Sequence, residues 1–307
     1  MPSLAKWAYL SIAAALVTIA LKSAAYLLTG SVGLLSDAIE SVVNLVAAVL
    51  ALAALKIAAR PADASHHFGH GKAEYFSAGA EGVMIFVAAL AIIVSAVQRL
   101  LNPQPLEELG LGLAITLVAT VINGVVGFLI LRAGRRHRSI TLVADGKHLL
   151  TDVWTSVGVV IGVGLVAVTG WLPLDALVAI AVGVNILWTG YGLVSHAGRG
   201  LMDHALPAAD EDRVVAVLRA VMAEHPQGEV EFHAVQTRES GRERFVSMHV
   251  LVPGEWTIAQ GHDLVERVEA DIRATLPDAH IHTHLEPRED PRSYGDAAGG
   301  VTLRAGE

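Results

Sequence analysis

The sequence predicts an all-α transmembrane domain of six spanning helices, followed by a small α+β domain of ferredoxin-like type. Of the 307 residues, 53% are hydrophobic and 17% are charged, and the mean hydropathy is +0.51. Such a chain is too apolar for an ordinary soluble protein. Charged residues reach ordinary soluble density only after about Met202. We therefore assign residues 1–202 to the membrane domain, 203–287 to the α+β domain and 288–307 to a disordered tail.

Six apolar runs are long enough to cross a hydrocarbon core, which takes roughly 20 helical residues. The first follows Lys6 and lacks a convincing small-residue cleavage site, so we interpret it as a retained helix. Glycine, proline and charged residues separate the runs. The predicted spans are about Leu4–Leu28, Val32–Ala58, Tyr75–Leu100, Leu109–Leu131, Leu142–Gly170 and Leu174–Val194.

Basic residues predict the orientation of these spans, because short cytoplasmic loops carry an excess of lysine and arginine. The first, third and fifth loops are almost free of them, apart from Arg99 at an edge. We therefore expect a multi-pass protein of the inner cell membrane with both termini in the cytoplasm. The second and fourth loops hold the basic residues, namely Arg60, Lys72, Arg132, Arg135, Arg136 and Arg138.

The region after the last span reads as helix, strand, strand, helix and strand, which is the order of a ferredoxin-like sandwich. Apolar residues recur at helical spacing in two segments, and Ser240 and Gly241 form a plausible hairpin turn between two alternating strands. The predicted elements are Asp210–Glu224, Glu229–Arg238, Arg244–Val252, Thr257–Leu276 and Ala279–Leu285.

Composition excludes several kinds of chemistry. The chain has no cysteine, so disulfides, thiolate metal sites and cysteine nucleophiles are absent and any metal must use histidine, carboxylate or amide ligands. The net charge is −8 and no long basic stripe is present, which argues against a nucleic acid partner.

Polar residues inside two predicted spans indicate a cation site. His148 and Asp152 lie four residues apart, on one face of the fifth span. Asp37, Glu40 and Asn44 share a face of the second span. Ionisable groups within a span are costly and mark a functional site by default, whereas Asn44 alone could serve only interhelical hydrogen bonding. Glu40, Asn44, His148 and Asp152 together would suit a divalent first-row metal.

Two further histidine groups are candidate metal sites. The second loop holds Asp63, His66 and His70, with His67 as an extra candidate, although a merely solvated polar loop is the alternative. In the α+β domain, His233 and His249 lie on neighbouring predicted strands. His282 and His284 share one face of a third strand, so these rings could converge or could remain scattered surface residues.

These stretches make the chain resemble the cation diffusion facilitator family, over nearly its whole length. The family comprises homodimeric six-span antiporters of divalent metals and protons, with a cytoplasmic ferredoxin-like domain, and the likeness is greatest to its bacterial zinc- and iron-exporting branch. The stretches that carry the resemblance are Gly30–Asp37, Phe68–Glu74, Asp145–Asp152 and Leu201–Pro207.

The resemblance implies a role for individual residues. It implies a transport site within the membrane, which we call the membrane site. At two positions of this site the compared branch has aspartates, whereas this chain has Glu40 and Asn44. It also implies an ion pair between Lys72 and Asp203. The expected ligand sets are Glu40, Asn44, His148 and Asp152 for the membrane site, Asp63, His66 and His70 for the loop site, and His233, His249, His262, His284 and Glu286 for the soluble-domain site.

The expected function is export of a divalent cation from the cytoplasm in exchange for protons, with zinc favoured and iron, manganese, cobalt and nickel open. The expected protein is a lipid-embedded homodimer and not an enzyme. Two alternatives are a membrane metalloenzyme, which would need a substrate cleft, and a membrane-anchored metal sensor. Polar groups deep in two spans argue against a plain anchor.

Overall fold

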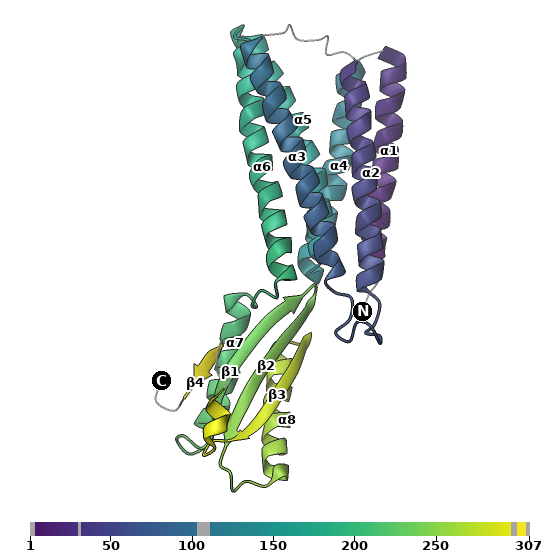
Figure 1. The fold of residues 1–307 in the computed structure, drawn as a ribbon. Helices are drawn as coiled ribbons and strands as arrows, with labels where there is room; N and C mark the ends of the chain where they lie inside the picture. The colour runs from purple at the N-terminus through teal and green to yellow at the C-terminus, as the bar shows by residue number, and fades with distance from the viewer. Residues whose placement is uncertain (1–3, 30–31, 103–110, 296–299, 305–307) are drawn as a thin grey trace. The chain divides into compact units, whose positions relative to one another are not determined.

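The computed structural model describes all residues except 1–3, 30–31, 103–110, 296–299 and 305–307. It divides into two compact units, Met1–Arg199 and Gly200–Glu307, which are described here one at a time. The first unit is helical and the second contains a sheet (Figure 1).

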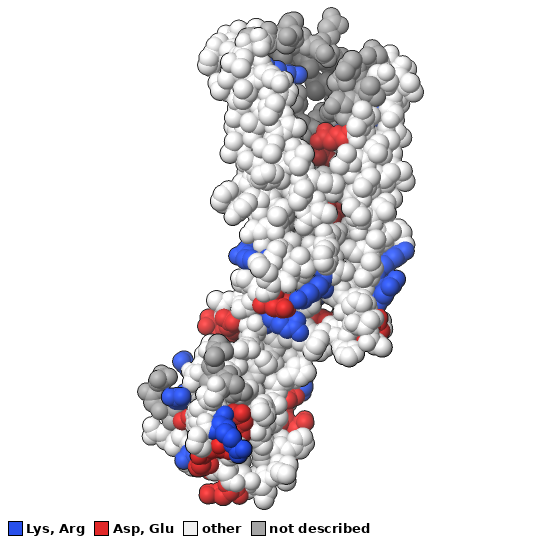
Figure 2. All heavy atoms as spheres, viewed as in Figure 1, with Lys and Arg blue, Asp and Glu red and all other residues white. Residues whose placement is uncertain are grey.

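Six helices in the first unit are long and apolar enough to cross a membrane. Their outward surface carries many exposed apolar side chains, and Figure 2 shows this unit as a largely uncharged body. Such a surface fits lipid and not water, which confirms the predicted spans. The helices are α1 (Ala5–Thr29), α2 (Val32–Ala58), α3 (Ala73–Leu101), α4 (Leu111–His137), α5 (Ile140–Thr169) and α6 (Pro173–Leu201).

The break predicted around the fourth loop is shorter than the sequence suggested. α4 continues to His137, so the basic residues before it form its last turn, where cations favour the negative helix end. Arg138 adopts a left-handed φ of 54° and Ser139 caps α5 by accepting from Leu142 N at 3.4 Å. The fall in hydropathy after Leu131 marks the end of the apolar span, but the helix continues until its backbone leaves helical geometry at Arg138.

Glycine allows α4 and α5 to approach closely. A Cβ on Gly146 would lie 2.7 Å from Leu131 N and 2.9 Å from Gly127 O, so only glycine fits at this crossing. Small residues allow such backbone contact between spanning helices. The two helices are joined by a tight turn and run antiparallel, so Asn123, four residues before Gly127, comes level with the stretch of α5 beyond Gly146.

The second unit has the predicted order of elements, and its sheet is mixed. β1 pairs with β2 antiparallel, while β2 pairs with β3 parallel after a helical crossover, which confirms the ferredoxin-like arrangement. Gly241, with φ of 62°, turns the hairpin. The elements are α7 (Ala208–Ala223), β1 (Glu231–Ser240), β2 (Glu243–Val252), α8 (Ile258–Thr275) and β3 (Ala279–Pro287).

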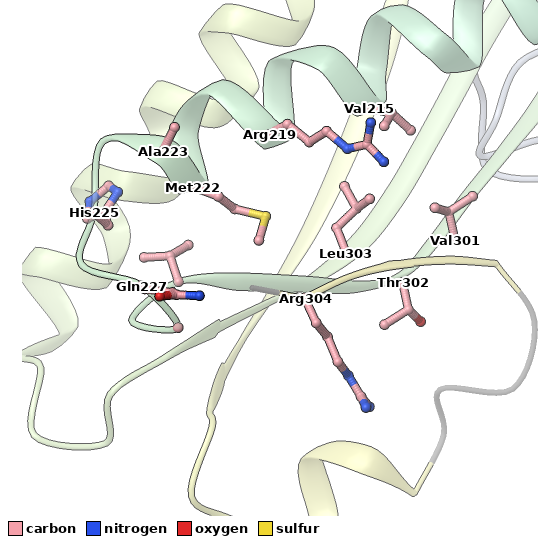
Figure 3. A pocket seen from close by; sticks show the side chains of 12 residues that line it. Val215, Arg219, Met222, Ala223, His225, Gln227, Val301, Thr302, Leu303 and Arg304 are labelled. Carbon is pink, nitrogen blue, oxygen red and sulfur yellow. The ribbon is translucent and has the colours of Figure 1, made fainter. Parts of the chain in front are cut away.

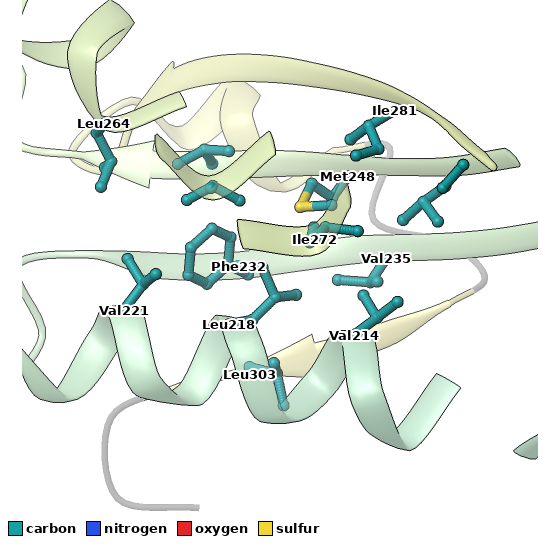
Figure 4. Packing of buried hydrophobic residues seen from close by; sticks show 14 of the residues in the cluster. Val214, Leu218, Val221, Phe232, Val235, Met248, Leu264, Ile272, Ile281 and Leu303 are labelled. Atoms are coloured by element: carbon teal, nitrogen blue, oxygen red, sulfur yellow. The ribbon is translucent and has the colours of Figure 1, made fainter. Parts of the chain in front are cut away.

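The hydrophobic core of the second unit lies between its helices and its sheet. Figure 4 shows Leu218 and Val221 of α7 facing Phe232 of β1, and these side chains are at most 2% exposed. Ile272 of α8 is fully buried in the same cluster. α8 starts with a reciprocal capping box between Thr257 and Gln260, which satisfies two backbone donors at its first turn.

The prediction of a disordered tail is wrong for two segments of residues 288–307. Pro291–Tyr294 forms a 3₁₀ turn, η1, and Val301–Leu303 forms a strand, β4, which pairs antiparallel with β1 to give the order β3-β2-β1-β4. Leu303 joins the core, and an edge strand gains hydrogen-bond partners when a further strand covers it. A groove of about 560 Å³ remains between α7 and β4, lined by Arg219, Met222 and Leu303 among others (Figure 3).

Candidate metal centres

The membrane site is built on α2 and α5, whose polar residues recur one helical turn apart. Asn44 of α2 is 3% exposed, and His148 and Asp152 of α5 are 5% and 8% exposed. Glu40, one turn before Asn44, is half-buried. Burial of this many polar groups among apolar helices is costly unless they bond to each other or to a cation.

Asn44 links His148 and Asp152 of α5. Its Oδ1 lies 2.8 Å from His148 Nε2, and its Nδ2 donates to Asp152 Oδ2. A carbonyl oxygen only accepts, so His148 Nε2 carries the proton in this arrangement. Asn44, His148 and Asp152, three of the four expected ligands, are therefore linked by hydrogen bonds.

Glu40 supplies a second carboxylate to this group. It interacts electrostatically with His148, so its negative charge acts on the membrane site from the α2 side. With Asp152 it gives the site a formal charge of −2 when both are ionised, which matches a divalent cation. The side chain of Asp37, the third polar residue predicted for this stripe, lies outside the described residues.

Asn123 of α4 joins the membrane site, and the sequence reasoning missed it. Its side chain is 2% exposed, and its Nδ2 donates to Asp152 Oδ2 at 3.3 Å. Its Oδ1 is buried without a hydrogen-bond partner. A lone asparagine in an apolar run gives little signal. The neighbouring Gly124 and Gly127 were the only hint, since they mark a close helix crossing.

Among its described residues, the first unit holds three further buried carboxylates, two of which, Glu74 and Asp145, bond to a neighbouring helix. Glu74 of α3 accepts from Ser139 Oγ at 2.5 Å and from Thr141 N at 3.4 Å, which anchors the start of α5. Asp145 accepts from Ser11 Oγ at 2.9 Å, and Glu81 accepts from Ser77 Oγ at 3.3 Å. The Glu74 contacts fix α5, and with it His148 and Asp152, relative to α3.

The structure brings the three residues of the predicted loop site together. His66 Nδ1 lies 3.4 Å from Asp63 Oδ1, and His70 Nε2 lies 3.5 Å from Asp63 Oδ2. Hydrogen bonds from the side chain and backbone of Ser65 hold the pKa of Asp63 well below its usual value, so this carboxyl stays ionised. The three ligand atoms lie within 4.8 Å of one another, which suits one metal ion. His67 instead contacts Ala64 O at 3.1 Å.

The soluble-domain site lies across three adjacent strands. Sheet register places His233 of β1 opposite His249 of β2, and His249 beside His284 of β3. A bulge follows His233, where Ala234 has φ of 48° and the register shifts. Neighbouring strands lie about 4.8 Å apart, so the rings form a row, with successive centroids 5.0 Å apart.

Glu286 is the common partner of these three histidines. Its Oε2 lies 3.0 Å from His233 Nε2 and 3.3 Å from His249 Nδ1, and its Oε1 lies 3.5 Å from His284 Nδ1. The ligand atoms of His233, His249 and Glu286 all lie within 4.8 Å of one another. A carboxylate shared by several imidazoles offers the mixed nitrogen and oxygen ligands that suit a first-row metal.

Three predicted residues lie apart from these groups. His262 is exposed on α8, where its Nε2 is 3.9 Å from Glu266, and His282 is exposed on β3. Asp203 pairs with Arg238 at 3.2 Å inside the second unit. Its expected ion pair with Lys72 would join the two units and stays a prediction.

Tyr294 is a second residue that the sequence reasoning missed. Its ring centroid lies 5.9 Å from that of His233, and its hydroxyl donates to Arg288 O at 2.8 Å. The 3₁₀ turn η1 thus places an aromatic ring against the buried end of the histidine row. Because the segment was predicted as a disordered tail, its tyrosine was not considered.

Comparison with protein families gives two matches that together span most of the chain. Residues 8–202 match the model of the cation efflux transmembrane domain, and residues 209–288 match that of the cytoplasmic domain of cation efflux proteins.

The chain also aligns with several known proteins. The chain is 54% identical over 288 residues to the uncharacterized transporter sll1263 of Synechocystis, covering 94% of this chain and 92% of that protein. It is 30% identical over 275 residues to the cation-efflux pump FieF of Salmonella arizonae, covering 90% of each. A solved structure of the metal-bound C-terminal domain of the CzcD transporter from Thermotoga maritima aligns at 22% identity and TM-score 0.24, covering 28% of this chain and 99% of that one.

Proposed function

The chain belongs to the cation diffusion facilitator family of multi-pass divalent-metal efflux transporters, which are not enzymes, and we propose that it exports zinc from the cytoplasm in exchange for protons. The observation that carries this proposal is the membrane site. Its four expected ligands are one imidazole, one amide and two carboxylates on spanning helices, with His148 joined to Asp152 through Asn44. A mixed nitrogen and oxygen set of four suits zinc, which favours four ligands.

Proton exchange follows from the chemistry of these ligands. A neutral His148 can bind a metal through Nε2 once its single ring proton lies on Nδ1, whereas an imidazolium must release a proton first, and the carboxylates bind best when ionised. Metal and protons therefore compete for the same atoms. A site that binds metal while open to the cytoplasm, and then opens to the outside, would release the metal there as it takes up protons.

The remaining sites and the assembly complete the proposal. We propose the inner cell membrane as the location, and the basic residues of the second and fourth loops support an orientation in which both termini, the loop site and the soluble domain lie in the cytoplasm. There the loop and soluble-domain sites would bind the same metal before or during transport. The protein would act as a homodimer in the lipid bilayer, with metal in the soluble domains strengthening contact between the two copies.

Purified protein in liposomes tests the proposed antiport. We expect zinc to accumulate in vesicles whose lumen is acidic relative to the outside, because proton exit would drive metal entry. Adding zinc without an imposed gradient should move protons in the opposite direction. The measurement uses a zinc-sensitive dye and a pH-sensitive dye in parallel, with protein-free vesicles as the control. Zinc uptake that ignores the pH gradient, with no counterflow of protons, would refute the exchange.

Asn44→Asp tests how the amide sets metal and proton coupling. A third carboxylate adds one negative charge to the site, so we expect the apparent KM for zinc to fall about tenfold near neutral pH, or ~1.4 kcal/mol. More protons should leave per metal bound, and affinity should fall more steeply as pH decreases. Competition of zinc uptake by iron, manganese, cobalt and nickel, at several pH values, measures both effects. Unchanged affinity and pH dependence would show that Asn44 lies outside the metal's coordination.

A further inference from the structure

We propose that Asn123 of α4 is a specificity-determining residue of the membrane site, whose amide oxygen is a fifth ligand for the cation. This inference rests on the proposed transport function and extends the site to a third helix. Neither the helical spacing of the polar residues nor the four expected ligands pointed to this position.

The contact with Asp152 places Asn123 at the site. Its Nδ2 donates to Asp152 Oδ2 at 3.3 Å, and that oxygen also accepts from Asn44. The two amides therefore reach the same carboxylate oxygen from α4 and α2. The close crossing at Gly127 and Gly146 fixes this geometry, because a Cβ at Gly146 would push the two backbones apart.

The amide oxygen of Asn123 is the atom on which the inference depends. It is buried, in a side chain 2% exposed, and has no hydrogen-bond partner. Buried polar atoms are nearly always paired, so an unpaired one needs an explanation. The oxygen shares a carbon with the nitrogen bound to Asp152, which places it within about 5.6 Å of that carboxylate oxygen by covalent geometry. Two oxygens that share one first-row cation, each about 2.2 Å from it, lie at most about 4.4 Å apart, so the amide oxygen would turn toward Asp152 when a cation binds there.

A fifth ligand changes which metals the site accepts. Zinc prefers four ligands, whereas manganese favours six oxygen-rich ligands of carboxylate, carbonyl and water type. With Asn123 the site offers four oxygen-bearing side chains and one imidazole. The amide adds no charge, so proton exchange is unaffected while the coordination number rises. Asn123 thus admits manganese to a site that without it would favour zinc.

Paired transport assays on full-length protein in liposomes test the inference. We expect wild-type protein to carry both zinc and manganese. Asn123→Leu keeps the size of the side chain and removes the oxygen. It should lower manganese flux relative to zinc flux by at least about tenfold, which is the smallest loss expected even for a group that only orients a ligand. Asn123→Asp keeps an oxygen at the same place and should preserve manganese flux. The matched control is Asn185→Leu, at an exposed asparagine of α6.

The outcomes separate this inference from the proposed function. If wild-type protein moves neither metal, the transport proposal fails. If it moves both and Asn123→Leu lowers both equally, Asn123 only positions Asp152 and the ligand assignment is overturned. If Asn123→Leu changes neither the ratio of manganese to zinc flux nor the rate of either, Asn123 has no role at the site. Size-exclusion profiles and melting temperatures of each variant distinguish a selectivity change from misfolding. Selective loss of manganese in Asn123→Leu, together with wild-type selectivity in Asn185→Leu, supports the inference.

Discussion

Asp152→Asn and His148→Ala should each reduce zinc flux in liposomes to near the protein-free background. Asp152 receives the amides of Asn44 and Asn123, and His148 supplies the only imidazole of the membrane site. Loss of a group that merely orients a ligand costs about 10 to 100-fold, so loss of a ligand itself should cost more than a hundredfold. Initial rates of uptake, measured with saturating zinc and an acidic lumen, give the size of the loss.

The control for Asp152→Asn is the same substitution at Asp175 of α6. Asp175 pairs with Arg99 at 3.2 Å and packs against Gly162. Gly162 lies ten residues beyond Asp152, or roughly 15 Å along the helix. Asp175→Asn should therefore leave transport close to wild type. Wild-type flux in both site variants, with protein that elutes and melts normally, would refute the assignment of the membrane site.

Helical periodicity was enough to predict the parts of the membrane site that lie on one helix. His148 and Asp152 are four residues apart, as are Glu40 and Asn44, and a helix places such pairs on one face whatever surrounds it. In the structure Asn44 contacts both His148 and Asp152 of α5. Local geometry therefore fixes each half of the site.

Contacts between distant segments could not be predicted in the same way. Asn123 reaches Asp152 only because Gly127 and Gly146 let α4 lie against α5, and a single sequence does not tell which helices are neighbours. The anchor of α5 on Glu74 is likewise a contact between residues far apart in the chain. Such packing depends on shape across a helix interface, which spacing within one helix does not record.

Strand alternation predicted the faces of the soluble-domain histidines but not their register. The row of His233, His249 and His284 depends on how β1, β2 and β3 are aligned, and on the bulge after His233. Tyr294 reaches this row from a segment whose glycines and prolines suggested disorder. This segment is ordered because part of it pairs with an edge strand of the sheet, which composition alone does not reveal.

Glu286→Gln should remove high-affinity metal binding at the soluble-domain site. Glu286 lies within 3.5 Å of all three imidazoles and is the only carboxylate among the grouped ligands in the described part of this site. Glutamine keeps the size but removes the charge, so a dication would be left with neutral ligands alone. We expect affinity for zinc to fall by at least about a hundredfold. Titration of full-length protein in detergent against a zinc chelator measures the number and affinity of sites.

His262→Ala is the informative control for that loss. The family resemblance makes His262 a ligand, whereas the structure places it exposed on α8 beside Glu266 at 3.9 Å. We expect His262→Ala to bind zinc at every high-affinity site of the wild-type protein, including the site that Glu286→Gln loses. Equal loss in both variants would mean that metal draws α8 onto the histidine row. Full affinity in Glu286→Gln would show instead that the histidines bind metal without the carboxylate, because the imidazoles of His233, His249 and His284 would then suffice.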